Sequence, residues 1–107
     1  MKIREKYTCP LEMTHDIIKG KWKPIILWQL NKYGVCSLSQ LKNDINGISE
    51  KMLLEQLKDL ISYKIIGKTS FRGYPLKVEY YLKKRGKKLF EVLTIMQEVG
   101  MEILEDK

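Results

Sequence analysis

The chain has 107 residues, of which 44% are hydrophobic, so we expect one folded domain over residues 1–107 with a modest core. It carries 20 lysine and arginine residues against 13 aspartate and glutamate residues, and a net charge of +7 favours a polyanionic partner. No apolar run is long enough to cross a membrane and the first residues lack the apolar segment of a signal peptide, which predicts a cytoplasmic protein with reduced thiols.

The positive charge is unevenly distributed along the chain. Residues 64–88 hold nine basic residues and one acidic residue, whereas residues 89–107 hold one basic residue and five acidic residues. The remaining segment, residues 1–63, is only weakly basic, with ten basic and seven acidic residues. The field that attracts a polyanion is therefore expected to centre on residues 64–88.

Turn residues divide the first part of the chain into helices. Pro10 suits the opening turn of a helix over about 10–19, which ends at Gly20. A second helix is predicted over 22–33, with Pro24 tolerated in its first turn. Its apolar residues cover more than one side, which predicts a central, buried helix; they are Trp22, Ile25, Ile26, Trp28 and Leu30.

The next segment has the pattern of two helices joined by a tight turn. Ser37 and Gln40 have the spacing of a capping box, which opens a short helix ending near Asn43. The pair Asn46-Gly47 then predicts a turn, and Ser49 is a good N-cap for a helix over about 49–62.

After this helix the hydrophobic period changes to that of strands. Residues 65–71 and 76–82 are rich in β-branched and aromatic residues and flank the turn cluster 72–75, so they predict a hairpin. A long helical pattern over 83–104 follows. The order predicts an α+β, mostly helical fold, a winged helix-turn-helix with a two-stranded wing.

The helix over 49–62 has one apolar and one polar face. Leu53, Leu57 and Leu60 form the core face, and in a helix-turn-helix the opposite face lies in the major groove. Lys51 can donate to guanine, Glu55 can accept from cytosine and Leu54 can pack on a thymine methyl group. The predicted DNA-binding residues of this helix are Ser49, Glu50, Lys51, Leu54, Glu55 and Lys58. The alternative is an ordinary solvated face, to which the Lys51–Glu55 spacing would add slight stability.

The predicted wing, residues 68–77, is basic. Lys68, Arg72 and Lys77 lie on or near the hairpin, with Tyr74 and Pro75 stiffening its tip. Arg72 in the turn is the best candidate for a contact with phosphate or the minor groove, and Lys77 is a second candidate. The lysines and arginine over 83–88 serve either the same field or only the solubility of the last helix.

The last helix is apolar around more than half of its circumference. One narrow stripe would serve the protein's own core, so the surplus predicts a second buried contact. A two-fold dimer would supply it and would place two recognition helices about one DNA turn (~34 Å) apart. The alternative is a helix fully buried within one small domain.

The two cysteines have different expected roles. Cys9 precedes Pro10 at a helix N-terminus with Arg4 and Lys6 nearby, which would favour a reactive thiolate and a redox switch. The alternative is a small apolar residue that fills a gap, which is the role expected of Cys36. Neither cysteine nor His15 has metal-ligand spacing, and no cofactor-binding or catalytic pattern occurs, so we expect neither a metal site nor an enzyme.

Several stretches together resemble the HxlR family of bacterial winged-helix transcription regulators, which is related to MarR. They are Cys9-Pro10, Gly20-Lys21-Trp22 followed by IILWQL, GISEKMLLEQLKDL from Gly47, and VEYYL from Val78 with Gly86 beyond it. The resemblance spans about residues 9–100. It implies a homodimer formed by the first and last helices on a pseudo-palindromic operator in double-stranded DNA, and in some relatives the cysteine matching Cys9 senses electrophiles or oxidants.

The chain departs from the family pattern at three positions. Ser37-Leu38 replaces a basic-aromatic pair, which weakens the transfer of a phosphate contact to that position; Lys83 replaces a hydroxyl residue, and Lys19 replaces a glycine. Two other functions stay open. One is a winged helix that binds proteins rather than specific DNA, and the other is a small thiol-redox or metal-binding protein.

Overall fold

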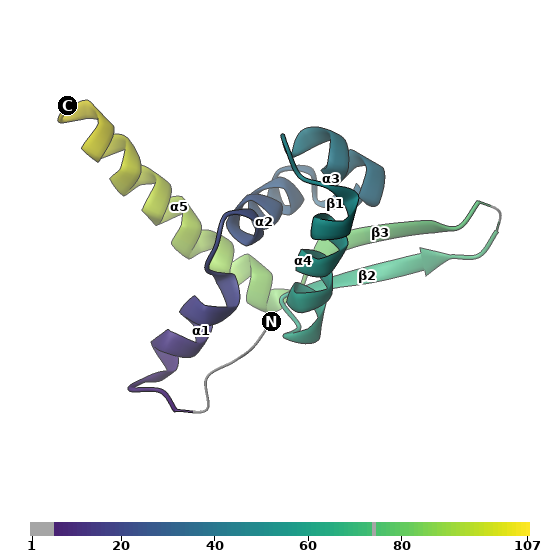
Figure 1. Cartoon of the computed structure of the whole chain (residues 1–107), viewed down its shortest axis with the longest axis horizontal. Coiled ribbons are helices and arrows are strands. Elements are labelled where there is room, and N and C mark those ends of the chain that lie inside the picture. The colour runs from purple at the N-terminus through teal and green to yellow at the C-terminus, as the bar shows by residue number, and fades with distance from the viewer. Residues whose placement is uncertain (1–5, 74) are drawn as a thin grey trace.

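The computed structural model describes residues 6–73 and 75–107. Arg4 and Tyr74, which the sequence analysis assigned to the surroundings of Cys9 and to the hairpin tip, lie outside the described residues. The elements are α1 (Pro10–Ile18), α2 (Trp22–Tyr33), β1 (Val35–Ser37), α3 (Leu38–Asp44), α4 (Glu50–Ser62), β2 (Ile66–Phe71), β3 (Lys77–Leu82) and α5 (Lys84–Glu105). The predicted mostly helical winged helix-turn-helix is confirmed, with element ends within one or two residues of those expected (Figure 1).

The core lies where α2, α3 and α4 pack against the base of the sheet. Its fully buried side chains are Ile26, Leu27, Leu30, Cys36, Leu41, Ile48, Leu53, Leu57, Leu60 and Ile66. The predicted core face of the helix that follows the turn is therefore confirmed. Ile25 was predicted to be buried but is 38% exposed, because it borders a surface hollow beside Trp28 and Met96 instead of facing the core.

The sheet has three antiparallel strands in the order β1-β3-β2. The hairpin pairs Ile66 with Leu82 at its base and Phe71 with Lys77 at its tip. Only these two strands were predicted from the sequence; the third, β1, in which Cys36 pairs with Tyr80, was not. A three-residue strand between a helix-ending glycine and a helix cap is too short to show a period of two. It anchors the wing's base to the helical core.

Two serine caps set the geometry of the helix-turn-helix. The Ser37 hydroxyl accepts a hydrogen bond from the Gln40 amide at 3.2 Å, and the Ser49 hydroxyl accepts one from the Met52 amide at 3.1 Å. Gly47 adopts a φ of 86° in the turn between α3 and α4, a left-handed conformation that favours glycine. Both predicted caps are thus confirmed, and the entry of α4 is fixed by local chemistry.

A tight joint connects the end of α4 to the start of α5. Arg85 donates from Nη1 to the Tyr63 carbonyl at 2.9 Å, so it satisfies a backbone group at the C-terminus of α4. The Lys83 amide donates to the Ile65 carbonyl at 3.0 Å. Gly86 packs so closely on the same carbonyl that a Cβ atom there would collide with it. The start of α5 is therefore held closely against the end of α4.

The helix α5 extends away from the rest of the molecule, so that its C-terminal half stands free of the other elements (Figure 1). Leu93 is its last buried residue, and every residue from Ile95 onward is exposed. A search of the described residues finds no helix whose length and apolar character would let it span a membrane.

Candidate nucleic-acid interface

The predicted recognition residues lie together on the outer side of α4. Opposite the buried stripe, all six are exposed, and they form what we call the recognition face: Ser49, Glu50, Lys51, Leu54, Glu55 and Lys58. Leu54 is 43% exposed, an unusual position for leucine on an otherwise charged helix surface. Lys51 and Glu55 are one turn apart on this face, so a donor and an acceptor are presented side by side. This combination of cation, acceptor and methyl groups matches what base edges offer in a major groove.

Ser49 can serve this face and the helix cap at the same time. Its oxygen accepts the Met52 amide, which leaves the hydroxyl hydrogen available for donation. The adjacent amides at the start of a 13-residue helix also lack intrahelical acceptors. An anionic oxygen at this position would receive several hydrogen bonds and a favourable interaction with the helix dipole.

The wing projects well beyond the helical core (Figure 1). Lys68 and Arg72 are exposed, and neither forms an ion pair with any residue in the described part of the chain. Lys77 differs, because its ammonium lies 3.3 Å from the Glu79 carboxylate and within 5.7 Å of the Phe71 ring. Arg72 therefore offers an unneutralised charge, whereas the charge of Lys77 is partly compensated.

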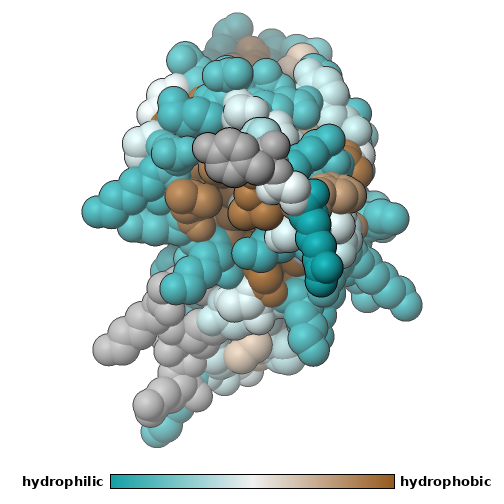
Figure 2. Space-filling model, turned by 90° about the vertical axis from the view of Figure 1, so that its right-hand side faces the viewer, coloured by the Kyte–Doolittle hydropathy of each residue, from teal (hydrophilic) through white to brown (hydrophobic). Residues whose placement is uncertain are grey.

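The surface at the wing's end is mainly hydrophilic, with smaller hydrophobic patches among the polar side chains (Figure 2). Phe71 and Leu76 are exposed on the hairpin and contribute hydrophobic surface there. A mixed surface of this kind can contact sugar and base edges as well as phosphates.

The basic segment 64–88 divides into two regions in space. One is the wing, and the other is a cluster at the joint between α4 and α5 that contains Lys64, Lys83, Lys84, Arg85 and Lys88. From the sequence, this segment was predicted to form a single positive field. Arg85 was missed as a structural residue, because its bond to the Tyr63 carbonyl spans 22 positions and has no local signal.

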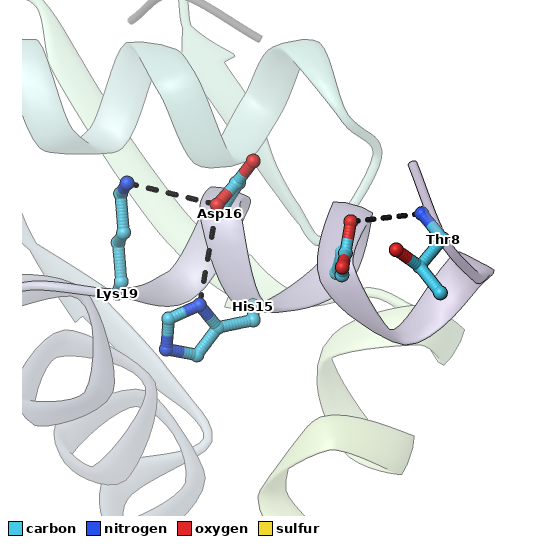
Figure 3. A network of polar contacts seen from close by, with 5 residues as sticks. Thr8, His15, Asp16 and Lys19 are labelled. Carbon is cyan, nitrogen blue, oxygen red and sulfur yellow. Dashed lines mark hydrogen bonds and ion pairs between the residues drawn. The ribbon is translucent and has the colours of Figure 1, made fainter. Parts of the chain in front are cut away.

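Cys9 is the N-cap residue of α1 and is exposed, but its side chain makes no capping hydrogen bond. A carboxylate occupies the neighbouring end of the helix instead: the Thr8 amide donates to Oε2 of Glu12 at 3.0 Å (Figure 3). The exposed Cys9 therefore does not fill a gap in the core, and it has an acidic neighbour in Glu12 that the sequence pattern did not indicate.

Cys36 is buried and its Sγ faces the Gln29 carbonyl at 3.8 Å. Burial, followed by the charge of Asp44, raises the pKa of the Cys36 thiol. It therefore stays a protonated, unreactive thiol, in agreement with the structural role predicted for it.

The lone histidine belongs to a small polar group on α1. His15 Nδ1 lies 4.0 Å from Asp16 Oδ1, and the same carboxylate oxygen is 3.6 Å from Lys19 Nζ (Figure 3). Among residues 6–73 and 75–107, no group of three His, Cys, Asp or Glu side chains is arranged to hold a metal ion.

The exposed helix α4, preceded by a short helix and followed by a projecting hairpin, defines a winged helix-turn-helix protein. The chain belongs to the HxlR-like helix-turn-helix family, whose model matches residues 17–107. It is therefore a transcriptional regulator of helix-turn-helix type and not an enzyme.

Relatives and solved structures agree with this assignment. The chain is 40% identical over 99 residues to a Fusobacterium mortiferum protein provisionally named regulatory protein MalR, covering 92% of this chain and 93% of that one. The redox regulator HypR in its reduced form superposes with a TM-score of 0.84 and 30% identity, over 92% of this chain and 100% of HypR. Reduced YodB from B. subtilis superposes with a TM-score of 0.76 and 30% identity, over 86% of this chain and 90% of YodB.

Proposed function

We propose that the protein acts in the cytoplasm as a homodimeric, sequence-specific DNA-binding regulator in which residues 1–107 form a single winged-helix domain. The observation that carries this proposal is the recognition face, a charged surface with an exposed leucine, beside a wing with unpaired cations. A solvated helix does not need an exposed leucine, whereas a thymine methyl group would cover it.

Each part of the surface has a distinct role in the proposed complex. Lys51, Leu54 and Glu55 contact base edges in the major groove. The Ser49 hydroxyl and the backbone amides at Ser49 and Glu50 hold a phosphate. Lys58 contacts the DNA phosphate backbone further along the major groove. Arg72 reaches the phosphates or the minor groove from the wing. Lys77 contributes less, because Glu79 already neutralises part of its charge.

The dimer is proposed to form through α1 and α5. Both helices carry large exposed apolar residues, among them Leu11 on α1 and Ile95, Met96 and Val99 on α5. Monomeric proteins seldom expose this many large apolar side chains on two helices without a partner surface. A two-fold axis between these helices would present the two recognition helices to a pseudo-palindromic operator.

Fluorescence anisotropy on the protein's own upstream DNA and on a scrambled duplex tests the proposal. We expect Lys51→Ala to lower the affinity for the upstream duplex by about 1–3 kcal/mol per half-site and to reduce discrimination, because it removes a base-edge donor. Arg72→Ala should weaken binding to both duplexes alike and lower the salt slope by about one per subunit. Lys107→Ala removes the same charge at the far end of α5 and should change neither the affinity for the two duplexes nor the salt slope.

Equal, weak binding to the upstream duplex, the scrambled duplex and duplexes selected from a random library would overturn the proposal. It would favour the protein-interaction module, for which Lys51→Ala and Arg72→Ala leave function intact. A small thiol-redox protein would instead lose its activity on replacement of Cys9 whatever its affinity for DNA.

Regulation through Cys9 is the finer part of the proposal. The exposed thiol begins a helix of the proposed dimer interface, and two similar structures, HypR and YodB, are regulators studied in reduced and in oxidised or diamide-treated forms. Oxidation to a sulfenic acid or a disulfide would add bulk or a crosslink at this end of α1.

A mild oxidant should therefore lower the affinity for the upstream duplex by about tenfold, a typical coupling between two sites. Cys9→Ser should abolish this response and keep the affinity of the reduced protein. Cys36→Ala should keep the response, because the buried thiol is protonated. A response that persists in Cys9→Ser would remove Cys9 from the mechanism; anisotropy before and after oxidation measures each case.

A further inference from the structure

Two hollows adjoin each other where α1, the end of α4 and the start of α5 meet (Figure 1). The first hollow has a volume of about 510 Å³, and its apolar lining consists of Met13, Ile17, Ile65, Leu89 and Val92. The second hollow has a volume of about 470 Å³ and is lined entirely by cations, which we call the joint cluster: Lys64, Lys83, Lys84, Arg85 and Lys88. Arg85 and Lys88 line both hollows, so an apolar space and a cationic space share one boundary.

The joint cluster has no carboxylate to neutralise it. None of its five side chains forms an ion pair with a residue that the structure describes. Arg85 donates from Nη1 to the Tyr63 carbonyl, which leaves the donors on Nε and Nη2 available. Glu91 follows Lys88 within one turn of α5, but it lines neither hollow. The boundary between the two hollows therefore carries positive charge that the described chain leaves unpaired.

The position of these cations is unfavourable for α5 itself. The first turn of α5 contains no acidic residue, and its N-cap residue Lys83 makes no capping hydrogen bond. Positive side chains at this end oppose the positive pole of the helix dipole. Lys84 and Lys88 are also four positions apart on one face of the helix, a spacing at which like charges repel each other. Helix formation alone would favour acidic or capping residues here, so these cations do not serve the helix.

Lys64 adds a cost in the backbone. It has a φ of 58° and is the one non-glycine residue with a positive φ in the described part of the chain. The Lys64 amide donates to the Ile61 carbonyl and the Ile65 amide to the Leu60 carbonyl, both at 3.0 Å. This pattern of hydrogen bonds ends a helix with a left-handed residue that is usually glycine. Glycine would relieve the strain, but it would remove a cation from the second hollow.

The helix α4 separates the joint cluster from the start of the recognition face. Ser49 caps the N-terminus of α4, whereas Lys64 follows its C-terminus, and 13 helical residues span about 20 Å. A duplex held at the start of α4 therefore does not explain why cations gather at its end. Their position beside an apolar hollow indicates a ligand with an apolar part and an anionic part.

We propose that the two hollows bind one small amphipathic anion, with a compact hydrocarbon body and a phosphate head. The body occupies the first hollow, where apolar side chains surround it. The head lies at the boundary, where Arg85 can donate two parallel hydrogen bonds through Nε and Nη2, and Lys64 and Lys88 supply charge. An apolar side chain of a partner subunit would cover the first hollow but would leave the joint cluster unpaired. The inference rests on neither the proposed DNA contact nor the proposed dimer.

Isothermal titration calorimetry of the full chain with 1-naphthyl phosphate, 1-naphthol and inorganic phosphate tests this site. We expect 1-naphthyl phosphate to bind at least about tenfold more tightly than the other two compounds, because it alone matches both hollows. Equal affinity for inorganic phosphate would reduce the site to a charged surface, and equal affinity for 1-naphthol would reduce it to an apolar hollow. Either result, or no binding of 1-naphthyl phosphate at about 1 mM, would overturn the inference.

Two substitutions in the joint cluster test the phosphate head. Lys64→Gly and Lys88→Ala should each weaken the binding of 1-naphthyl phosphate by about three- to fivefold, the range of a partly solvated charge contact. Lys64→Gly should also leave the thermal midpoint at or above that of the wild type, so its loss of binding could not be ascribed to unfolding. Lys87→Ala is the matched control, because Lys87 is an exposed neighbour of Lys88 that lines neither hollow. Unchanged affinity in both Lys64→Gly and Lys88→Ala would contradict the proposed site.

NMR spectra of the methionine methyl groups locate the hydrocarbon body. The naphthyl ring should shift the resonance of Met13, which lines the first hollow, through its ring current. Met101 is 54% exposed near the far end of α5, and its resonance should stay in place. Met96 lines a different hollow, beside Trp28. A shift confined to Met96 would place the ligand in that other hollow and would overturn the inference.

Discussion

Replacing Asp59 by alanine is expected to lower the free energy of unfolding by about 3–5 kcal/mol, because it strands a buried positive charge. Lys23 on α2 has a side chain that is only 6% exposed, and its Nζ lies 3.2 Å from Oδ2 of Asp59 on α4. Without the carboxylate, the ammonium would lose its counter-charge while water remained largely excluded. The free energy of unfolding of a domain of this size is about 5–15 kcal/mol in total, so the substitution would remove a large share of it.

Urea unfolding monitored by circular dichroism, at one fixed protein concentration, measures this loss. Asp44→Ala is the matched control: Asp44 is an exposed carboxylate of the same helix-turn-helix, and its removal should cost less than about 0.5 kcal/mol. The double variant Lys23→Met with Asp59→Leu should be close to wild type, because it removes the charge and its partner together. A loss below about 1 kcal/mol in Asp59→Ala would show that the pair is effectively solvated.

This ion pair marks the limit of what the sequence predicts. The helices and the hairpin follow from local signals, such as the serine caps, the Asn46-Gly47 turn and the change in hydrophobic period. Lys23 and Asp59 are 36 positions apart, and each looks like an ordinary surface charge beside its neighbours. Only the packing of α2 against α4 brings them together, so no pattern in the sequence identifies them.

The candidate interface shows the same division. The recognition face was predictable from the wheel of a single helix, and the structure exposes all six of its residues. The charge that each basic residue leaves free for DNA was not predictable, because it depends on which residues the fold brings next to it. Arg85 is bound to the Tyr63 carbonyl and Lys77 to Glu79, whereas Arg72 has no ion-pair partner among the described residues.

An exposed apolar stripe on α5 leads to the other large effect. We call it the second stripe, and it is made of Val92, Ile95, Met96, Val99 and Ile103. Ile95→Glu is expected to abolish dimerisation at micromolar concentration and to lower the affinity for the upstream duplex by about 100-fold or more. Ile95 is 60% exposed in the single chain and lies in the middle of the stripe. The dyad would place two carboxylates in an apolar contact, and a dimer gains its affinity by holding two half-sites at once.

Met101→Glu provides the matched control, since Met101 is 54% exposed on the same helix but lies on the side away from the second stripe. This variant has the same change in net charge and should keep both the dimer and its affinity for the upstream duplex.

Sedimentation equilibrium and anisotropy at several salt concentrations separate the causes of any loss. A monomer contacts half as many phosphates, so the slope of log affinity against log salt should fall to about half in Ile95→Glu. If Ile95→Glu remained dimeric, the second stripe would not be the interface. If it became monomeric yet kept full affinity and slope, the recognition helices would act singly, and the proposed two-half-site operator would be wrong.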